Sequence, residues 1–402
     1  MITEEAAYTP EIAEVVKRID AIRPVLLEHG AQGEQDRTIP AEAFKALEDT
    51  GAFRLSVPTR FGGYAGNSRD SLAVARAIGR GDGGASWVYG ILNSGAWVAA
   101  LLPLQAQEEL WADSPDTLIS IILAPSSTAT KVDGGYRLSG KWHYGTGSRH
   151  SQWSLLGMPL VDEHGNVVDN GLALIPNSDL TIEETWYVAG MKSTGSNAQV
   201  AEDIFVPEHR ILPLTAAVEG TYPGSGINPE TSYKPVFVPA LFLQLVGPHL
   251  GMGRAVLDKV LDSASKKAIA YTTYERQADA VSFQLAMARA TLLLETAEGF
   301  AYRIADELYA GAERGDYYGY PERIRMRAEV GFAVECVTQA IDVLVSAHGS
   351  AAFADSSLIQ RFWRDQATAA RHGHTLPASG YEAFGKVLLG LEKEAQGVLP
   401  VV

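Results

Sequence analysis

The chain has 402 residues, with 33 Lys and Arg against 48 Asp and Glu, and a formal net charge of −15 at pH 7. This acidic balance disfavours nucleic acid and anionic membrane surfaces as partners, because both are negatively charged. Hydrophobic residues make up 46% of the chain and charged residues 20%, which allows a large core and excludes a disordered polymer.

A single cysteine, Cys336, excludes an internal disulfide and a cysteine-based zinc site. It favours a reducing compartment. The acidic start, Met1-Ile-Thr-Glu-Glu, lacks the basic segment and apolar core of a signal peptide. A cytoplasmic protein is therefore predicted.

Residues 1–115 predict an N-terminal helical domain. Apolar residues recur at steps of three and four positions, as an amphipathic helix requires, and Gly residues follow the periodic segments. Helices are predicted over 12–30, 41–50 and 68–79, the last with Ser68 as its N-cap. The stretch Gly83–Gln107 carries no charge, but we expect Asn93-Ser94-Gly95 to break it and Pro103 to end it, so no membrane span is predicted.

Residues 116–215 predict a central antiparallel β-domain. Short alternating runs are separated by Gly, Asn and Asp, and Gly134-Gly135 and residues 162–166 are typical of hairpin turns. The Pro- and Gly-rich connection 216–235 is either a mobile segment over a site or an inert surface linker.

Residues 236–402 predict a C-terminal four- or five-helix bundle. A 3.6-residue period returns over 241–271, 280–310, 323–348, 358–371 and 377–394. The fold class expected from the whole chain is mainly α with a central β-domain.

Several common catalytic motifs are missing. Gly79-Arg-Gly-Asp-Gly-Gly84 matches GxGxxG, but no strand precedes it, so a dinucleotide site is not expected. There is no P-loop, HExxH or GxSxG motif. His372-Gly-His374 has the letters of a metal pair, but alternate residues of a helix point in different directions and no third ligand is evident, so no metal is predicted.

Four strings, in this order and spacing, carry a resemblance to a known family: Val132-Asp-Gly-Gly-Tyr-Arg-Leu-Ser-Gly-Lys-Trp142, Gly145-Thr-Gly-Ser148, Gly190-Met-Lys-Ser-Thr-Gly-Ser196 and Arg361-Phe-Trp-Arg-Asp365. With the helix–β–helix order, the chain resembles the acyl-CoA dehydrogenase superfamily. More closely, it resembles the oxygenase components of two-component flavin-dependent monooxygenases that share that fold.

This resemblance implies a homotetramer that receives FADH2 or FMNH2 from a separate NAD(P)H-dependent flavin reductase. It implies that O2 reacts with the reduced flavin to give a C4a-hydroperoxide, which hydroxylates an aromatic substrate. No nicotinamide site is found in this chain, in agreement with reduction elsewhere.

The dehydrogenase branch needs a carboxylate as general base next to the acyl carbon. Its usual position, nine residues after the Arg of the Arg-Asp pair, is Gly373 here, and 366–381 contain no Asp or Glu. The other known position lies at the start of the first long bundle helix, but 231–257 contain no acid. Both base positions are empty, so dehydrogenation is disfavoured.

The monooxygenase branch places a histidine eight residues after the same Arg, which here is His372. The resemblance implies that His372 offers or withholds a proton at the flavin adduct, a role that suits imidazole near neutral pH. The competing interpretation is that His372 is an ordinary histidine at a helix end.

The resemblance also implies a set of flavin contacts. Thr146 and Ser148 would contact flavin N5 and the pyrimidine edge, and Trp142 would form a wall for the isoalloxazine, although a plain core tryptophan is the competing interpretation. Arg276 and Gln284 would reach the pyrophosphate or adenine across a subunit contact.

One departure bears on the substrate. Phenol-hydroxylating relatives carry a histidine in the middle of the uncharged stretch, where this chain has Gly95, with Asn93 nearby. A ring that needs no deprotonation, such as an indole, tolerates this loss, and so does an amine. Asn93 and Trp97 are the predicted substrate contacts, and Trp87, Tyr89 and Trp97 would line an aromatic pocket.

We therefore expect the oxygenase component of a flavin monooxygenase acting on an aromatic, indole-type substrate. An N-hydroxylase of an amine or amino sugar stays open as the nearest alternative. An acyl-CoA dehydrogenase and a flavin-free binding protein on the same fold are the others.

Overall fold

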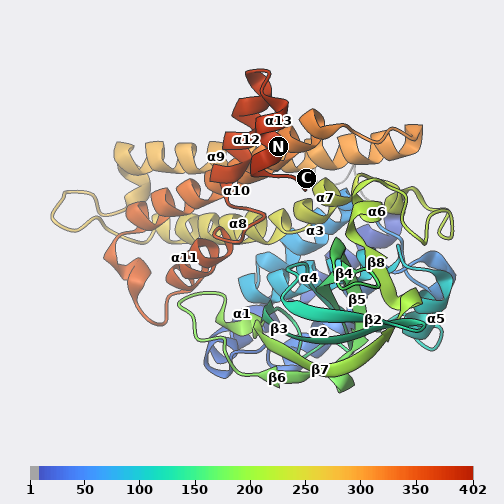
Figure 1. Cartoon of the computed structure of the whole chain (residues 1–402). Helices are drawn as coiled ribbons and strands as arrows, with labels where there is room; N and C mark the ends of the chain where they lie inside the picture. The colour runs from blue at the N-terminus through green and yellow to red at the C-terminus, as the bar shows by residue number, and fades with distance from the viewer. Residues whose placement is uncertain (1–8, 402) are drawn as a thin grey trace.

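The computed structural model describes residues 9–401. In Figure 1 the strands lie on one side of the molecule, and the long C-terminal helices lie across the other. The N-terminal helices are α1 (Pro10–Asp36), α2 (Ala41–Asp49), α3 (Ser68–Gly79), α4 (Gly83–Ala99) and α5 (Leu104–Trp111). The three helices predicted from periodicity are confirmed, with two differences in their ends. α1 continues to Asp36, past its predicted end at Gly30, and the N-cap of α3 is Asn67, one residue before the predicted Ser68.

The uncharged stretch departs from its prediction. Asn93-Ser94-Gly95 does not break it, because α4 runs without interruption from Gly83 to Ala99 and is buried along its whole length. Ser94 donates to the Gly90 carbonyl one turn earlier and so satisfies its hydroxyl inside the helix. Burial on all sides thus keeps weak helix formers helical.

The strands form two four-stranded sheets. One has the order β1-β4-β5-β8 and the other β2-β3-β7-β6. Their bounds are β1 (Ile119–Ile122), β2 (Ser127–Val132), β3 (Gly135–Gly145), β4 (Trp153–Val161), β5 (Val167–Pro176), β6 (Thr181–Glu183), β7 (Asn197–Pro207) and β8 (Ile211–Pro213). Both predicted hairpins, β2–β3 and β4–β5, are confirmed.

The connection after the sheets includes the short helix α6 (Leu214–Val218) and then packs against α4 and its C-terminal end. Asn228 donates to the Ala100 carbonyl, and the Ser232 carbonyl accepts from the Trp97 indole. The second half of the connection is therefore anchored to the N-terminal helices.

The C-terminal helices are α7 (Phe237–Leu243), α8 (Val246–Ala264), α9 (Val281–Arg314), α10 (Tyr320–His348), α11 (Leu358–Ala369), α12 (Pro377–Leu388) and α13 (Glu392–Val398). Two helical stretches, Phe237–Ala264 and Tyr320–His348, are long and apolar enough to cross a membrane by length and composition. Their most apolar windows are 94% and 56% buried inside the protein, as expected of helices that form the core of a bundle.

Candidate active site

The turn Gly145–Ser148 follows β3 and projects a hydroxyl into the interior. The pairing of β3 with β7 shifts register between Trp142 and Gly145, and Tyr144 has a φ of 69°, in the left-handed region. Such a bulge redirects the side chains that follow it. Thr146 is buried, and its Oγ1 lies 2.6 Å from Ser196 Oγ.

Ser196 belongs to the loop 190–196, which contains the Gly-Met-x-x-Thr-Gly-Ser string. Its Oγ lies 2.7 Å from Thr194 Oγ1, and Thr194 Oγ1 donates to the Met191 carbonyl at 2.9 Å. The Met191 amide in turn donates to Asp365 Oδ1 on α11. The β-domain and the bundle thus meet at this loop.

Asp365 is buried at this junction. Burial raises the pKa of its carboxyl to about 7, and the negative charge of Asp82 raises it further, while the Met191 amide and the Arg361 guanidinium oppose the shift. The carboxyl therefore favours its neutral form more than an exposed aspartate does.

Ser148 lies in the same turn and is also buried. Its Oγ has no hydrogen-bond partner among the described residues. Leaving a buried hydroxyl unsatisfied costs about 1–3 kcal/mol, so a polar ligand at this turn would be stabilised. This orphaned hydroxyl fits the flavin contact that the sequence predicts for Ser148.

Trp142 does not lie where the prediction requires. Its side chain is fully buried between the two sheets, and its indole N–H donates to the Gly157 carbonyl at 2.7 Å. A wall for a flavin needs one free ring face, and Trp142 has none. The wall prediction is therefore wrong, and Trp142 is a core residue of the β-domain.

His372 belongs to a cluster of aromatic rings between α11 and α12. Its ring meets Trp87 of α4 edge-on at a centroid distance of 5.4 Å and His374 at 5.1 Å. His374 lies 3.7 Å from the Phe242 ring centroid. The two histidines come together because residues 372–374 form a turn and not the helix assumed from the sequence.

The electrostatics of the cluster favour neutral imidazoles. Burial lowers the pKa of His372 to about 4, and the positive charge of Arg327 contributes. Burial also lowers the pKa of His374, helped by His372 and Arg327. No carboxylate is among the groups that shift the pKa of either histidine in the described chain.

Arg327, on α10, closes one side of the cluster. Its Nη2 donates to the Gly373 carbonyl at 2.6 Å, and its Nη1 is buried without a partner within residues 9–401. Burial lowers the pKa of its guanidinium to about 10. Gly373 is exposed, and a side chain added there would meet no other residue.

His249 is a further histidine of the cluster, which the sequence analysis missed. It is fully buried in α8, 5.8 Å from the Trp87 ring, and burial lowers its pKa to about 4. Its Nδ1 lies 2.7 Å from Gln366 Oε1, and Gln366 Nε2 donates to Thr338. The amide oxygen only accepts, so Nδ1 carries the proton and Nε2 is a free acceptor. A lone histidine in an apolar helix gives no sequence signal for this role.

The two predicted substrate residues both contact protein groups, but Asn93 Oδ1 is buried without a hydrogen-bond partner among the described residues. Asn93 donates to Gln244 at 2.8 Å, and the Trp97 indole stacks on Phe237 at 5.7 Å. Both are buried, and their contact with a substrate stays a prediction.

Two expectations about α4 are corrected. A Cβ at Gly95 would lie 2.0 Å from the Ile119 carbonyl oxygen, so no side chain fits there and Gly95 faces β1, not a ligand. Tyr89 packs at 6.0 Å from Phe53 in the N-terminal core, whereas Trp87 packs beside His372. The predicted three-ring pocket therefore does not form, because successive helix positions face different directions.

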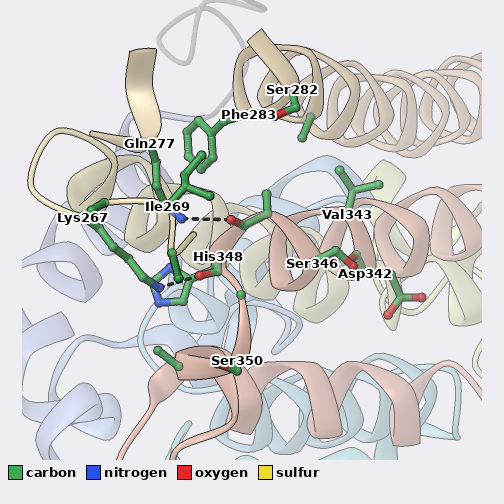
Figure 2. Close-up of a pocket in the computed structure, with 16 residues that line it drawn as sticks. Lys267, Ile269, Gln277, Ser282, Phe283, Asp342, Val343, Ser346, His348 and Ser350 are labelled. Atoms are coloured by element: carbon green, nitrogen blue, oxygen red, sulfur yellow. Dashed lines mark hydrogen bonds between the residues drawn. The ribbon is translucent and has the colours of Figure 1, made fainter. Parts of the chain in front are cut away.

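A surface pocket of about 750 Å³ lies at the far end of the bundle, between the start of α9 and the end of α10 (Figure 2). Lys267, Gln277, Ser282, His348 and Ser350 line it. The Lys267 ammonium and the hydroxyls suit phosphate oxygens, whereas the Asp342 carboxylate, which also lines the pocket, opposes an anion.

The predicted Arg276 and Gln284 lie beside this pocket and not among the residues that line it. Arg276 is exposed and pairs with Asp279, and Gln284 donates to the Ala278 carbonyl. The neighbour Gln277, which does line the pocket, has a buried Oε1 without a partner in the described part of the chain. Within residues 9–401, no three His, Cys, Asp or Glu side chains are grouped so that they could hold a metal ion.

Comparisons with known proteins agree with this architecture. Residues 12–111 match the N-terminal domain and residues 243–377 the C-terminal domain of acyl-CoA dehydrogenases. The oxygenase subunit HsaA of a flavin-dependent monooxygenase from Rhodococcus jostii is 33% identical over 94% of this chain and 98% of its own length. Indole-3-acetate monooxygenase of Pseudomonas putida is 31% identical over 70% of each chain.

Among solved structures, XiaF from Streptomyces in complex with FADH2 and glycerol superposes with a TM-score of 0.88. It is 33% identical and covers 94% of this chain and 96% of its own. Neither dehydrogenase base position carries a carboxylate. This observation, the extent of the matches and the FADH2 bound by the similar structure all indicate a monooxygenase. The chain belongs to the oxygenase components of two-component flavin-dependent monooxygenases, built on the acyl-CoA dehydrogenase fold.

Proposed function

We propose that this chain hydroxylates a neutral aromatic ring of indole type, with Thr146 and Ser148 at the flavin and His372 at the reacting oxygen. The observation that carries this proposal is the cluster of neutral imidazoles packed against Trp87 and Phe242. It combines a proton donor or acceptor with apolar walls, and no carboxylate of the described residues acts on its two histidines.

Reduced flavin, supplied by a separate reductase, would provide the electrons that activate O2. Thr146 and the unpartnered Ser148 hydroxyl would hold its ring edge. Trp87 and Phe242 would exclude water from His372, which prevents reduced oxygen from leaving as peroxide before it reaches the substrate. FAD and FMN both remain candidates, because the ring contacts are common to both.

The neutral state of His372 supports its assigned role. With a pKa of about 4, the imidazole carries one N–H and one lone pair at pH 7, so it can donate a hydrogen bond and also accept a proton. A permanently charged group could not do both.

The electrostatics also bear on the substrate. Arg327 is the cation beside His372 and His374, and an ammonium substrate would be repelled there without a carboxylate to balance it. This favours a neutral ring over the amine or amino sugar of an N-hydroxylase. The uncharged stretch Gly83–Gln107 contains no histidine that could deprotonate a phenol, which favours an indole over a phenolate. The name of the relative indole-3-acetate monooxygenase supports the same ring.

An acyl-CoA dehydrogenase is disfavoured by the same cluster. There is room for a side chain at Gly373, yet neither predicted base position has a carboxylate. Packing therefore does not explain the missing base.

A homotetramer is proposed on two observations. Val281, Leu285 and Leu292 are 61–67% exposed and lie on one stripe of α9, and exposed apolar stripes of this kind mark interfaces. The pocket at His348 lies 21 residues along α10 from Arg327, about 30 Å at 1.5 Å per residue. That pocket, with Arg276 and Gln284 beside it, would thus serve the flavin of a neighbouring subunit. A cytoplasmic location stays a prediction.

The experiment that tests the function is anaerobic mixing of the protein with FADH2 or FMNH2, followed by O2 and an indole in a stopped-flow spectrometer. A delay before oxidised-flavin absorbance appears, together with hydroxylated indole, is the expected result. Immediate appearance of oxidised flavin, with all the oxygen recovered as peroxide, would contradict the proposal.

A further inference from the structure

The buried hydroxyls of Thr146, Ser196 and Thr194 form a continuous chain that ends on the Met191 carbonyl. The three successive distances are 2.6, 2.7 and 2.9 Å. Each hydroxyl has a single hydrogen to donate, and the carbonyl oxygen can only accept. These two facts fix the direction of every hydrogen bond in the chain.

The assignment starts at the carbonyl. Thr194 must donate to Met191, because two oxygens at 2.9 Å without a hydrogen between them would repel each other. Thr194 has then used its hydrogen, so Ser196 donates to Thr194 and Thr146 donates to Ser196. Thr146 Oγ1 is left with lone pairs and no hydrogen for a further partner.

The anchor of the chain is itself fixed. The Met191 carbonyl also accepts from the Trp186 indole at 2.9 Å, and the Met191 amide donates to the buried Asp365. The Gly147 amide donates to the Thr194 carbonyl at 3.3 Å, which ties the Thr146 turn to the loop. The donors and acceptors around the three hydroxyls therefore allow no other direction for their hydrogen bonds.

We propose that Ser196 and Thr194 are positioning residues that make Thr146 an obligatory hydrogen-bond acceptor, so that this site selects reduced over oxidised flavin. This rests on the proposed contact of Thr146 with flavin N5. Reduced flavin carries an N–H at N5 and donates to Thr146, whereas oxidised flavin has only a lone pair there and meets another lone pair. The inference gives the Gly190-Met-x-x-Thr-Gly-Ser196 string a physical role.

Such selection suits an oxygenase that takes flavin from a separate reductase. Oxidised flavin is the product that must leave, and a site that accepts it equally well would be occupied by it. One hydrogen bond gained in one state and lost in the other corresponds to a ratio of dissociation constants of about tenfold.

The test is a pair of titrations, anaerobic with FMNH2 and aerobic with FMN, repeated with FADH2 and FAD, with no turnover. In Ser196→Ala the Thr146 hydroxyl loses its acceptor and becomes free to donate to oxidised N5. We expect the reduced-to-oxidised preference to fall about tenfold, mainly because oxidised flavin binds more tightly. Thr194→Val, which lets Ser196 reverse its hydrogen bond, should shift the preference in the same direction.

Two controls separate this effect from structural damage. Ser196→Thr keeps the hydroxyl and should keep the preference. Ser120→Ala removes a buried hydroxyl of β1 that donates to the Thr146 carbonyl and not to its side chain. This variant should change both affinities by the same factor. A gain in affinity for one redox state is a result that loss of packing alone does not produce.

The outcomes distinguish this inference from the function on which it rests. A wild-type protein that binds neither redox state would refute the proposed function. A wild-type protein that binds both, with the same preference in Ser196→Ala and Thr194→Val as in wild type, would overturn the role of the hydroxyl chain alone.

Discussion

Replacement of His372 by alanine removes the imidazole that we place at the reacting oxygen. Its pKa of about 4 lies well below the ordinary value of 6.5, and a shift of that size corresponds to about 3 kcal/mol against protonation in place. The wild-type imidazole therefore stays neutral from pH 5.5 to pH 8. Loss of its hydrogen bond should lower the yield of product per reduced flavin about tenfold, with peroxide released instead.

The assay measures hydroxylated product and peroxide in single turnovers of pre-bound reduced flavin at several pH values. In wild type, the ratio of product to peroxide should show no inflection near pH 6.5. His372 takes up a proton only as the pH falls toward its lowered pKa of about 4. Flavin affinity and the melting temperature serve as controls for folding. An unchanged product yield in His372→Ala would remove His372 from the mechanism. A wild-type inflection near pH 6.5 that the variant lacks would refute the lowered pKa of His372.

Three further predictions concern packing and pH. Gly95→Ala should lower the melting temperature markedly, because the new Cβ would lie 2.0 Å from the Ile119 carbonyl; a melting temperature equal to that of wild type would contradict the packing of α4 on β1. Trp142→Phe should cost about 1 kcal/mol of stability through the lost hydrogen bond to Gly157, while flavin affinity is retained; weaker flavin binding at full stability would restore Trp142 as a flavin wall. Asp365 has its pKa raised to about 7, so the native state binds a proton that the unfolded state releases above about pH 4, and stability is lost as the pH rises toward 7. The melting temperature of Asp365→Asn relative to wild type should therefore increase between pH 4.5 and 7.5, and a constant difference would disprove the shift.

Residue spacing along the chain predicts only part of the histidine cluster. Counting eight residues from Arg364 identifies His372 as a candidate, but nothing in the sequence places His249 beside it. His249 is more than 100 residues away in the chain and lies in an apolar helix, where an isolated histidine indicates only a core position. The packing of α8 against α4 and α11 brings both histidines to Trp87.

The Gly190–Ser196 string shows the same limit. The sequence identifies the string by resemblance, but the hydrogen-bond direction depends on a 2.6 Å contact between residues 50 positions apart. Trp142 illustrates the opposite error, in which a residue inside a recognised string belongs to the core of the β-domain and not to the ligand.

The sequence by itself determined the order of helices and strands, both hairpins and the absence of a dehydrogenase base, because these depend on local periodicity, turn residues and residue identity. It did not determine that α4 continues through Asn93–Gly95, which face of that helix meets which neighbour, or which buried hydroxyl donates to which. Those features depend on burial and on contacts between distant segments, which offset weak local propensities and orient polar groups. Only the tertiary structure therefore decided the composition and the polarity of the candidate site.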